Sequence, residues 1–324
     1  MDQVVVAELI DPLGLQILRS HGAVLYDPAL FRDRPGLFGA LASARGLVVR
    51  NQTAVGPELL AAAPRLRVVG RLGAGLDNVD RPALEDRGIH LVYAPDAATA
   101  SVAEFTLALI LALFKDLGRA QRPTFRGGWD RSGYRGLEAW GKTVGILGLG
   151  RIGRAVADRA AALGMKVTAY HPRLGAGARD IGGTDAGGTR VALAPMDELL
   201  AGCDVLTLHL PLGPATRGLI GRRELRLMRP GSYLVNTSRG AVLDEEALYD
   251  ALGAGHLAGA ALDVRAREPP GARPPFGELP NVILTPHVAA LTREAQERIA
   301  REVAAGVVEH LQAAGVESCR EIMP

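Results

Sequence analysis

The sequence contains little cysteine and little lysine, and these shortages narrow the classes of protein it can belong to. Its two cysteines, Cys203 and Cys319, lie far apart and form no CxxC motif, which argues against a disulfide scaffold and against a zinc site. We therefore expect no metal centre, and we expect a protein of the reducing cytoplasm. Three of the 37 basic residues are lysine, Lys115, Lys142 and Lys166, and this arginine bias gives no functional indication.

A charge excess and a long apolar run are missing as well. The 37 basic residues nearly balance the 35 acidic residues, so the basic footprint of a nucleic-acid-binding protein is absent. The longest apolar run, residues 105–114, is about half of what a bilayer requires, and the N-terminus does not resemble a secretory signal. We expect neither a nucleic acid nor a membrane among the partners.

Two series of short apolar runs, separated by amphipathic stretches, predict an α/β protein with two domains. The first series predicts five strands: Val4–Ala7, Val24–Tyr26, Leu47–Val49, Val68–Val69 and Ile89–Val92. The second predicts six: Thr143–Leu147, Lys166–Tyr170, Asp204–Leu208, Tyr233–Val235, Ala258–Leu262 and Val282–Leu284. Six strands that alternate with helices suit a doubly wound sheet.

A helix is expected between the two series, from Thr99 to Lys115. Thr99 or Ser101 can cap it, and Glu104 follows Ser101 with the spacing of a capping box. Because this helix is apolar nearly all round, it should be buried between domains or subunits.

Two other segments complete the organisation. Residues 119–141 are polar and contain glycine, so we expect an extended arm, and its Trp129 and Trp140 should pack an interface. The last helix, expected over residues 292–313, could return to cover the first domain.

A glycine-rich motif follows the strand that ends at Leu147. The motif comprises Gly148, Leu149, Gly150, Arg151, Ile152 and Gly153. Its first glycine permits a tight turn, its second lets a pyrophosphate approach the backbone, and its third lets helix and strand pack closely. The helix N-terminus then stabilises the anion, so the strand, turn and helix together predict a dinucleotide site.

The choice between NAD and NADP depends on the end of the next strand. NAD-specific sites have a carboxylate there, but this sequence has His171 followed by Arg173. These residues could bind the 2′-phosphate of NADP through charge-assisted hydrogen bonds. Alternatively they are solvated loop residues of an enzyme that uses NAD. We expect NADP in preference to NAD.

Three chemically active side chains follow strands of the second series. Arg239, Glu268 and His287 come after the strands that end near residues 235, 262 and 284, and open α/β sheets bind ligands at this edge. Histidine can exchange a proton with a carbonyl or hydroxyl oxygen. A neighbouring carboxylate stabilises its imidazolium form, and arginine can bind a carboxylate with two hydrogen bonds. Each residue alone could be structural, but together they predict hydride-transfer chemistry with His287 as the acid and base.

The sequence resembles the D-isomer-specific 2-hydroxyacid dehydrogenase family over nearly its full length. The motifs that carry the resemblance are Arg71–Asp80, Gly148–Gly153, His209–Leu212 with Thr216, Asn236–Gly240, Asp263 with Glu268–Pro269, and Thr285–His287. The resemblance implies a flavodoxin-like substrate domain formed by residues 1–98 and 289–324. It also implies an inserted Rossmann cofactor domain over residues 99–288, a cleft that closes on ligand, and a homodimer built on the cofactor domain.

The family's functional residues can be carried over position by position. The resemblance assigns substrate binding to Arg239, proton transfer to His287 and support of the histidine to Glu268. The substrate carboxylate would bind the backbone amides of Ala74 and Gly75. For the cofactor, the resemblance implies that Arg151 and Ile152 contact the pyrophosphate and that Asp263 contacts the nicotinamide amide. The positions that it implies along the cofactor groove are His209, Pro211, Thr216 and Thr237.

Departures from the family pattern leave the substrate open. His171 replaces the acidic residue of NAD-dependent members, and Arg265 and Arg267 stand where aromatic or apolar residues are frequent. We expect both arginines to be surface residues; otherwise one of them, or Arg50, would bind a second anionic group of the substrate.

The resemblance favours reduction of small 2-oxo acids such as glyoxylate or hydroxypyruvate. A formate dehydrogenase would pair its histidine with glutamine rather than with Glu268, and a long-form phosphoglycerate dehydrogenase would have a regulatory domain after the last helix. The alternatives are a dehydrogenase of another small anion and a dinucleotide-sensing protein that resembles the corepressors of this fold.

Overall fold

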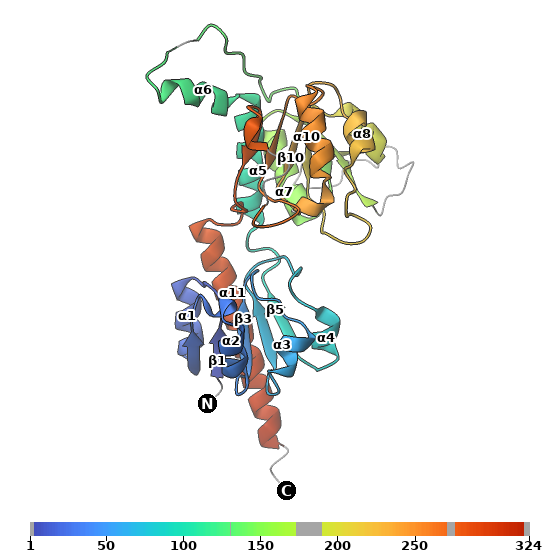
Figure 1. The fold of residues 1–324 in the computed structure, drawn as a ribbon. Helices are drawn as coiled ribbons and strands as arrows, with labels where there is room; N and C mark the ends of the chain where they lie inside the picture. The colour runs from blue at the N-terminus through green and yellow to red at the C-terminus, as the bar shows by residue number, and fades with distance from the viewer. Residues whose placement is uncertain (1–2, 130, 173–189, 271–275, 321–324) are drawn as a thin grey trace. The chain divides into compact units, whose positions relative to one another are not determined.

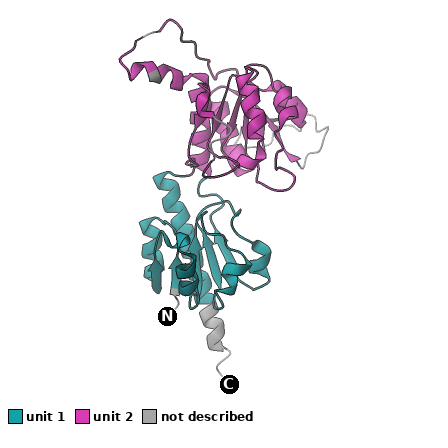
Figure 2. Cartoon of the chain, viewed as in Figure 1, with its two compact units in different colours: residues 1–98, 291–324 teal, residues 99–290 magenta. Residues whose placement is uncertain are grey.

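The computed structural model describes residues 3–129, 131–172, 190–270 and 276–320. The chain divides into two compact units, shown in Figure 2. Unit 1 comprises residues 1–98 and 291–324, and unit 2 comprises residues 99–290. Each unit has its own sheet, and every strand pair in both sheets is parallel, which agrees with the predicted α/β class.

The sheet of unit 1 has the strand order β2-β1-β3-β4-β5. Its strands are β1 (Gln3–Val6), β2 (Ala23–Tyr26), β3 (Gly46–Val49), β4 (Val68–Arg71) and β5 (His90–Tyr93). The order is that of flavodoxin-like folds, whose ligand position lies where the chain reverses direction across the sheet. In unit 1 this position is between the carboxyl ends of β1 and β3.

Helices cover both faces of this sheet (Figure 1). They are α1 (Pro12–Arg19), α2 (Arg34–Leu41), α3 (Pro57–Ala61), α4 (Arg81–Glu85) and α11 (Arg293–Arg320), with the short 3-10 helix η1 (Leu30–Arg32). Three of them start at an aspartate whose side chain accepts a backbone N–H: Asp11 caps α1, Asp33 caps α2 and Asp80 caps α4. Proline in the first turn fixes the backbone for the helix. The sequence therefore specifies these starts locally.

Helix α11 packs on unit 1, as expected of the last helix, although it extends beyond the predicted end to Arg320. It contacts α1 and the strands β4 and β5. A Cβ atom at Gly70 would lie 2.8 Å from side-chain carbons of Val303 and Val307, so the missing side chain allows the helix to approach the sheet closely.

The sheet of unit 2 has the order β12-β11-β10-β9-β6-β7-β8. The strands are β6 (Thr143–Leu147), β7 (Lys166–Tyr170), β8 (Ala192–Leu193), β9 (Val205–Leu208), β10 (Tyr233–Asn236), β11 (Gly259–Leu262) and β12 (Val282–Leu284). Strand β8 was not predicted, because two residues give no periodic signal. The chain reverses direction across the sheet between β6 and β9, which is the ligand position of a doubly wound fold.

Two helical layers cover this sheet, as its two hydrophobic clusters show. Helices α5 (Thr99–Phe114) and α7 (Arg151–Ala162) pack on one face, and α8 (Met196–Gly202), α9 (Arg222–Leu227) and α10 (Glu245–Gly253) pack on the other. The short 3-10 helices η3 (Gly240–Val242) and η4 (Phe276–Glu278) lie in the connections. No helix in the described part of the chain is long and apolar enough to cross a bilayer.

The predicted capping box at the start of α5 is wrong. Ser101 lies inside the helix and is buried, and Glu104 faces Arg159 of α7, with 3.5 Å between the carboxylate and guanidinium atoms. The buried face of α5 packs on α7, β10 and β11 of its own unit, so a position between domains is not needed to explain its apolar sequence.

The expected arm contains a helix. Helix α6 (Leu117–Thr124) occupies its first part, and the described residues that follow, 125–129 and 131–142, form no helix or strand. Figure 1 shows this segment projecting from the rest of unit 2. The side chains of Phe125, Trp129 and Trp140 are 79%, 82% and 76% exposed in the single chain.

Candidate active site

The glycine-rich turn of unit 2 follows β6, at the point between β6 and β9 where the chain reverses direction across the sheet. Gly148 follows β6 with a φ of 104°, and a Cβ atom there would lie 2.5 Å from the carbonyl oxygen of His209 after β9. A Cβ atom at Gly153 would collide with the carbonyl oxygen of Gly148, whereas a Cβ at Gly150 would meet only open space. The first and third glycines thus permit close backbone packing, and the second leaves room for a ligand.

The N-terminus of α7 is open to an anion. The helix starts at Arg151, and Gly150 supplies no side-chain cap to the first-turn amides. Uncapped N–H groups and the helix dipole favour a negative group at such a position. The open face of Gly150 and the uncapped start of α7 together fit the pyrophosphate of a dinucleotide.

The positions expected to line the cofactor groove have defined contacts. Burial lowers the pKa of His209 to about 3, so its ring is neutral and adds no charge near the phosphates. The hydroxyl of Thr216 donates to the carbonyl of Pro211 at 2.6 Å and accepts from the amide of Gly213 at 2.9 Å, which closes the loop after β9.

Thr237 contacts helix α5. Its hydroxyl lies 2.9 Å from that of Thr106, which in turn donates to the carbonyl of Val102. Because the single hydroxyl proton of Thr106 is used in this way, Thr237 is the donor of the pair. The contact fixes the start of the loop that carries Arg239.

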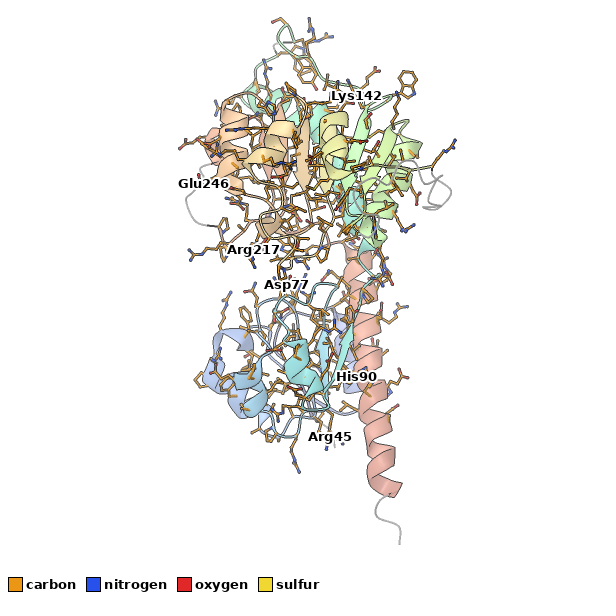
Figure 3. The ribbon with its side chains drawn as sticks, turned by 90° about the vertical axis from the view of Figure 1, so that its right-hand side faces the viewer. Arg45, Asp77, His90, Lys142, Arg217 and Glu246 are labelled. Carbon is orange, nitrogen blue, oxygen red and sulfur yellow. The ribbon has the colours of Figure 1, made fainter. Side chains whose placement is uncertain are left out.

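His171 directly follows β7, at the carboxyl edge of the sheet, and is partly buried. Arg173 lies outside the described residues. Figure 3 helps to locate this edge in unit 2: Arg217, in the loop after β9, lies at the end opposite Lys142, which precedes β6.

The structure brings the three predicted catalytic side chains to this edge. Arg239, Glu268 and His287 follow β10, β11 and β12, which are neighbours in the sheet. Asn236 stabilises the turn before Arg239: its amide group donates to the carbonyl of Arg239 at 3.0 Å, and its oxygen accepts from the amide and hydroxyl of Ser238.

Glu268 and His287 form a direct pair. Nδ1 of His287 lies 2.7 Å from Oε2 of Glu268, and their side chains are 42% and 37% exposed. Partial burial by itself raises the pKa of Glu268, but hydrogen bonds from His287 and from the amide of Arg265, with the charges of His287 and Arg239, lower the pKa below its ordinary value. The carboxylate is therefore ionised at neutral pH, and the charge of Arg239 acts on it.

A buried aspartate fixes the backbone around His287, which has a φ of 57° in the left-handed region. The carbonyl of Asp263 accepts the amide of His287 at 2.8 Å. Its carboxylate accepts the hydroxyl of Thr285 at 2.5 Å and the amides of Val288 and Ala289, both at 2.9 Å. These bonds hold the loop in a conformation that is unfavourable for a non-glycine residue.

The prediction that Arg265 is a surface residue is wrong. Its side chain is 11% exposed and forms a two-point ion pair with Glu245 at 3.1 and 2.8 Å. The two residues are twenty positions apart, so no local pattern in the sequence indicates the pair. Arg267 is exposed.

Unit 1 has a separate cluster at the carboxyl ends of β1 and β3. The buried carboxylate of Glu8 accepts the backbone amides of residues 50–53 at 2.9 to 3.2 Å. The loop that carries Arg50 is thereby fixed, and Asn78 adds hydrogen bonds to the carbonyls of Arg50 and Thr53. Sequence reasoning missed Glu8, although an acidic residue directly after a buried strand is a signal that could have indicated it.

The turn after β4 contains the two amides that the family resemblance implies for the substrate carboxylate. Ala74 is exposed and Gly75 is partly buried. Within the described part of the chain, neither amide has a hydrogen-bond acceptor, so both can bind an added anion.

A doubly wound fold with this glycine turn is that of a dinucleotide-binding protein. Comparison with known proteins specifies the family. A family model described as D-isomer specific 2-hydroxyacid dehydrogenase, NAD binding domain, matches residues 107–289. The chain belongs to the D-isomer-specific 2-hydroxyacid dehydrogenase family.

Among curated proteins, D-3-phosphoglycerate dehydrogenase from Archaeoglobus fulgidus is 41% identical over 307 residues, which cover 94% of this chain and 56% of that protein. The enzyme of the same name from Mycobacterium tuberculosis is 45% identical over 276 residues, which cover 85% of this chain and 51% of that protein. The chain thus spans about half the length of the curated relatives it matches.

Solved structures agree along nearly the whole chain. The TT0316 protein from Thermus thermophilus has a TM-score of 0.87 at 33% identity and covers 96% of this chain and 97% of its own. A D-lactate dehydrogenase from Aquifex aeolicus, complexed with NAD and lactic acid, has a TM-score of 0.82 at 28% identity and covers 99% of each chain.

Proposed function

We propose that this protein is an oxidoreductase that transfers a hydride between a nicotinamide cofactor and C2 of a small 2-oxo or D-2-hydroxy acid. The observation that carries the proposal is the Glu268–His287 hydrogen bond at the carboxyl edge of the unit 2 sheet, with the charge of Arg239 acting on the carboxylate. A proton donor, a group that stabilises it and a cation for the substrate are the requirements of carbonyl reduction.

The residues divide the reaction as follows. A nicotinamide cofactor held at the glycine-rich turn and the start of α7 would supply the hydride to C2 in reduction and would accept it in oxidation. Nδ1 of His287 is hydrogen-bonded to Glu268, so Nε2 gives its proton to the carbonyl oxygen, and a 2-oxo acid with one hydride and one proton becomes a 2-hydroxy acid. Neutral His287 takes the proton back in oxidation. Arg239 binds the substrate carboxylate and polarises the neighbouring carbonyl.

Two substrate predictions differ by one anionic group. The sequence motifs favour glyoxylate or hydroxypyruvate, whereas the curated relatives at 41% and 45% identity are named D-3-phosphoglycerate dehydrogenase. A glyoxylate reductase from Paecilomyces thermophila is 29% identical. We therefore test first the phosphorylated 2-oxo acid that forms when D-3-phosphoglycerate is oxidised at C2. Hydroxypyruvate and glyoxylate follow.

In unit 1, the amides of Ala74 and Gly75 are proposed to bind the substrate carboxylate. Arg50 is proposed to bind a second anionic group if the substrate has one. Desolvation lowers the pKa of Arg50 and the nearby charge of Glu8 raises it, with a net decrease. An anionic ligand would offset that desolvation. The pairing of Arg265 with Glu245 leaves Arg50 and Arg267 as the arginines proposed for this role.

The exposed apolar side chains of the arm support a homodimer built on unit 2. They are Leu117, Phe125, Trp129, Leu137 and Trp140. Large apolar side chains gathered on one projecting segment favour a protein–protein interface.

The proposed function is tested by initial rates of NADH and NADPH oxidation with the phosphorylated 2-oxo acid, hydroxypyruvate, glyoxylate and pyruvate. Turnover of one or more acids is expected. Cofactor binding without turnover of any acid would contradict the proposal and favour a dinucleotide sensor. Oxidation of an unrelated small anion would instead favour the other alternative.

Cofactor preference gives a first substitution test. NAD-bound and NADPH-bound structures both occur among the solved relatives, and we propose NADPH as the preferred cofactor because His171 occupies the position of the usual acidic residue. His171→Asp should lower kcat/KM for NADPH relative to NADH by about 10- to 100-fold, the value of one charge-assisted hydrogen bond. Lys142→Asp, at the opposite end of the sheet, is the control. An unchanged ratio in His171→Asp would remove His171 from the phosphate site.

The pH dependence of the reaction tests Glu268. Because its folded-state pKa is lowered, Glu268 is ionised above its ordinary pKa of 4.5 and loses its charge only as the pH falls through the lower folded value. The wild-type rate of reduction should therefore fall only at acid pH, below 4.5, as Glu268 gains its proton, whereas Glu268→Gln has no carboxyl group to titrate and should lack this decline. Glu246→Gln, an exposed substitution on α10 (Figure 3), should leave the profile unchanged. Superimposable profiles for Glu268→Gln and the wild type would contradict the assignment.

A further inference from the structure

A buried ion pair joins the loop after β11 to the start of α10. Nε and Nη2 of Arg265 lie 3.1 and 2.8 Å from the two carboxylate oxygens of Glu245, and each side chain is 11% exposed. The guanidinium also lies over the ring of Phe276, 4.9 Å from its centre. By contrast, the pair Arg222–Asp250, on α9 and α10, is more than half exposed on both sides.

Glu245 binds the backbone of this loop as well as the arginine. Its Oε1 accepts the amide of Ala266 at 2.6 Å. As the first residue of α10, Glu245 also lies where the helix dipole favours a negative charge. Burying two charges is costly unless both are well hydrogen-bonded, and here three donors satisfy one carboxylate.

The loop after β11 also touches the loop of Arg239. A Cβ atom at Gly240 would collide with the backbone of Arg265 and Ala266, so these two backbones are in direct contact. Gly240 directly follows Arg239. The backbone of Arg265 and Ala266 is thus packed against Gly240, which limits how far the loop after β11 can move.

The backbone connects this ion pair to the proposed acid–base pair. The amide of Arg265 donates to Oε1 of Glu268 at 3.1 Å, and Oε2 of Glu268 accepts Nδ1 of His287 at 2.7 Å. The side chain of Arg265 is turned toward Glu245 and Phe276, so it affects the histidine only through the loop.

We propose that Arg265 and Glu245 are positioning residues whose ion pair orients Glu268 toward His287. The proposal rests on the proposed function of Glu268 and His287. It assigns to Arg265 a role in the chemical step and none in recognising the substrate. Loss of the ion pair should therefore lower kcat and leave KM for the 2-oxo acid and the dissociation constant of the cofactor unchanged.

The test compares Arg265→Met, Glu245→Gln and the double variant with Arg222→Met as a matched control. Each single variant should lower kcat about tenfold, because small misplacements of reacting groups are costly. The double variant should be no slower than the single variants, since both act through one contact. Its melting temperature should recover, because no buried charge is left unpaired. Arg265→Lys should restore part of kcat, and Arg222→Met should match the wild type.

A purely structural role would give a different result. In that case the double variant would regain kcat together with its melting temperature, and this outcome would overturn the proposal. Unchanged kcat in Arg265→Met would overturn it as well.

A second readout does not depend on turnover. The ¹⁵N and ¹H NMR signals of the His287 ring, in protein labelled at histidine, report its hydrogen bond to Glu268 directly. Glu268 remains in Arg265→Met, so a change in these signals would reflect a change in its orientation. The signals should shift in Arg265→Met and keep their positions in Arg222→Met. Unshifted signals in Arg265→Met would refute the positioning role. If no 2-oxo acid is reduced, shifted signals would support positioning while the proposed function fails.

Discussion

Replacement of His287 by asparagine is expected to lower kcat by a factor of about 10² to 10⁴, the usual contribution of a positioned acid–base group. Asparagine is the appropriate substitute because His287 has a φ of 57°, and asparagine adopts left-handed backbone more readily than most residues. The loop that Asp263 holds should therefore keep its shape, and the loss should report on proton transfer. Steady-state kinetics in the direction of reduction measure it.

The control for this substitution is His21→Asn, which makes the same chemical change at an exposed histidine of unit 1. It should keep wild-type rates. Binding of the cofactor, followed by fluorescence, should be similar in His287→Asn and in the wild type. If His287→Asn retained near-normal kcat with an intact fold, another group would have to supply the proton.

Arg239 should give the second large effect. Arg239→Gln removes the charge proposed to bind the substrate carboxylate and to polarise the carbonyl, in the ground state and in the transition state alike. We expect kcat/KM to fall by about 10² to 10³, the range for loss of one preorganised electrostatic contact, with a higher KM and a lower kcat. Arg239→Lys should recover part of the loss, because lysine retains the charge but not the planar two-point geometry.

Arg222→Gln is the matched control for this arginine. Its guanidinium pairs with Asp250 on the surface, 2.6 Å from the carboxylate, and an exposed pair of this kind contributes little to stability. Wild-type kinetics are expected. Wild-type values of both kcat and KM in Arg239→Gln would exclude Arg239 from the site.

Local sequence patterns were sufficient to predict the α/β class and most of its strands. Buried apolar runs such as Leu47–Val49 lie in observed strands. The failures occurred where the local signal was ambiguous or too short. Ser101 and Glu104 have the spacing of a capping box, but the helix starts before them, and the two residues of β8 give no periodicity.

The candidate site shows the same limit. Arg239, Glu268 and His287 could be predicted because each follows a strand, and the ends of parallel strands meet at one edge. The supporting contacts could not be predicted in this way. The pairing of Arg265 with Glu245 depends on how the chain folds between residues 245 and 265. The hold of Asp263 on the His287 loop likewise depends on tertiary structure.

The most direct test of the central claim is the fate of the transferred hydrogen. A reduction carried out with a nicotinamide cofactor deuterated at the reactive ring carbon, in ordinary water, should give a 2-hydroxy acid with deuterium at C2, detected by mass spectrometry. The oxygen-bound proton, supplied through His287, should come from solvent. A product without deuterium at C2, or no product although the cofactor binds, would contradict hydride transfer at this site.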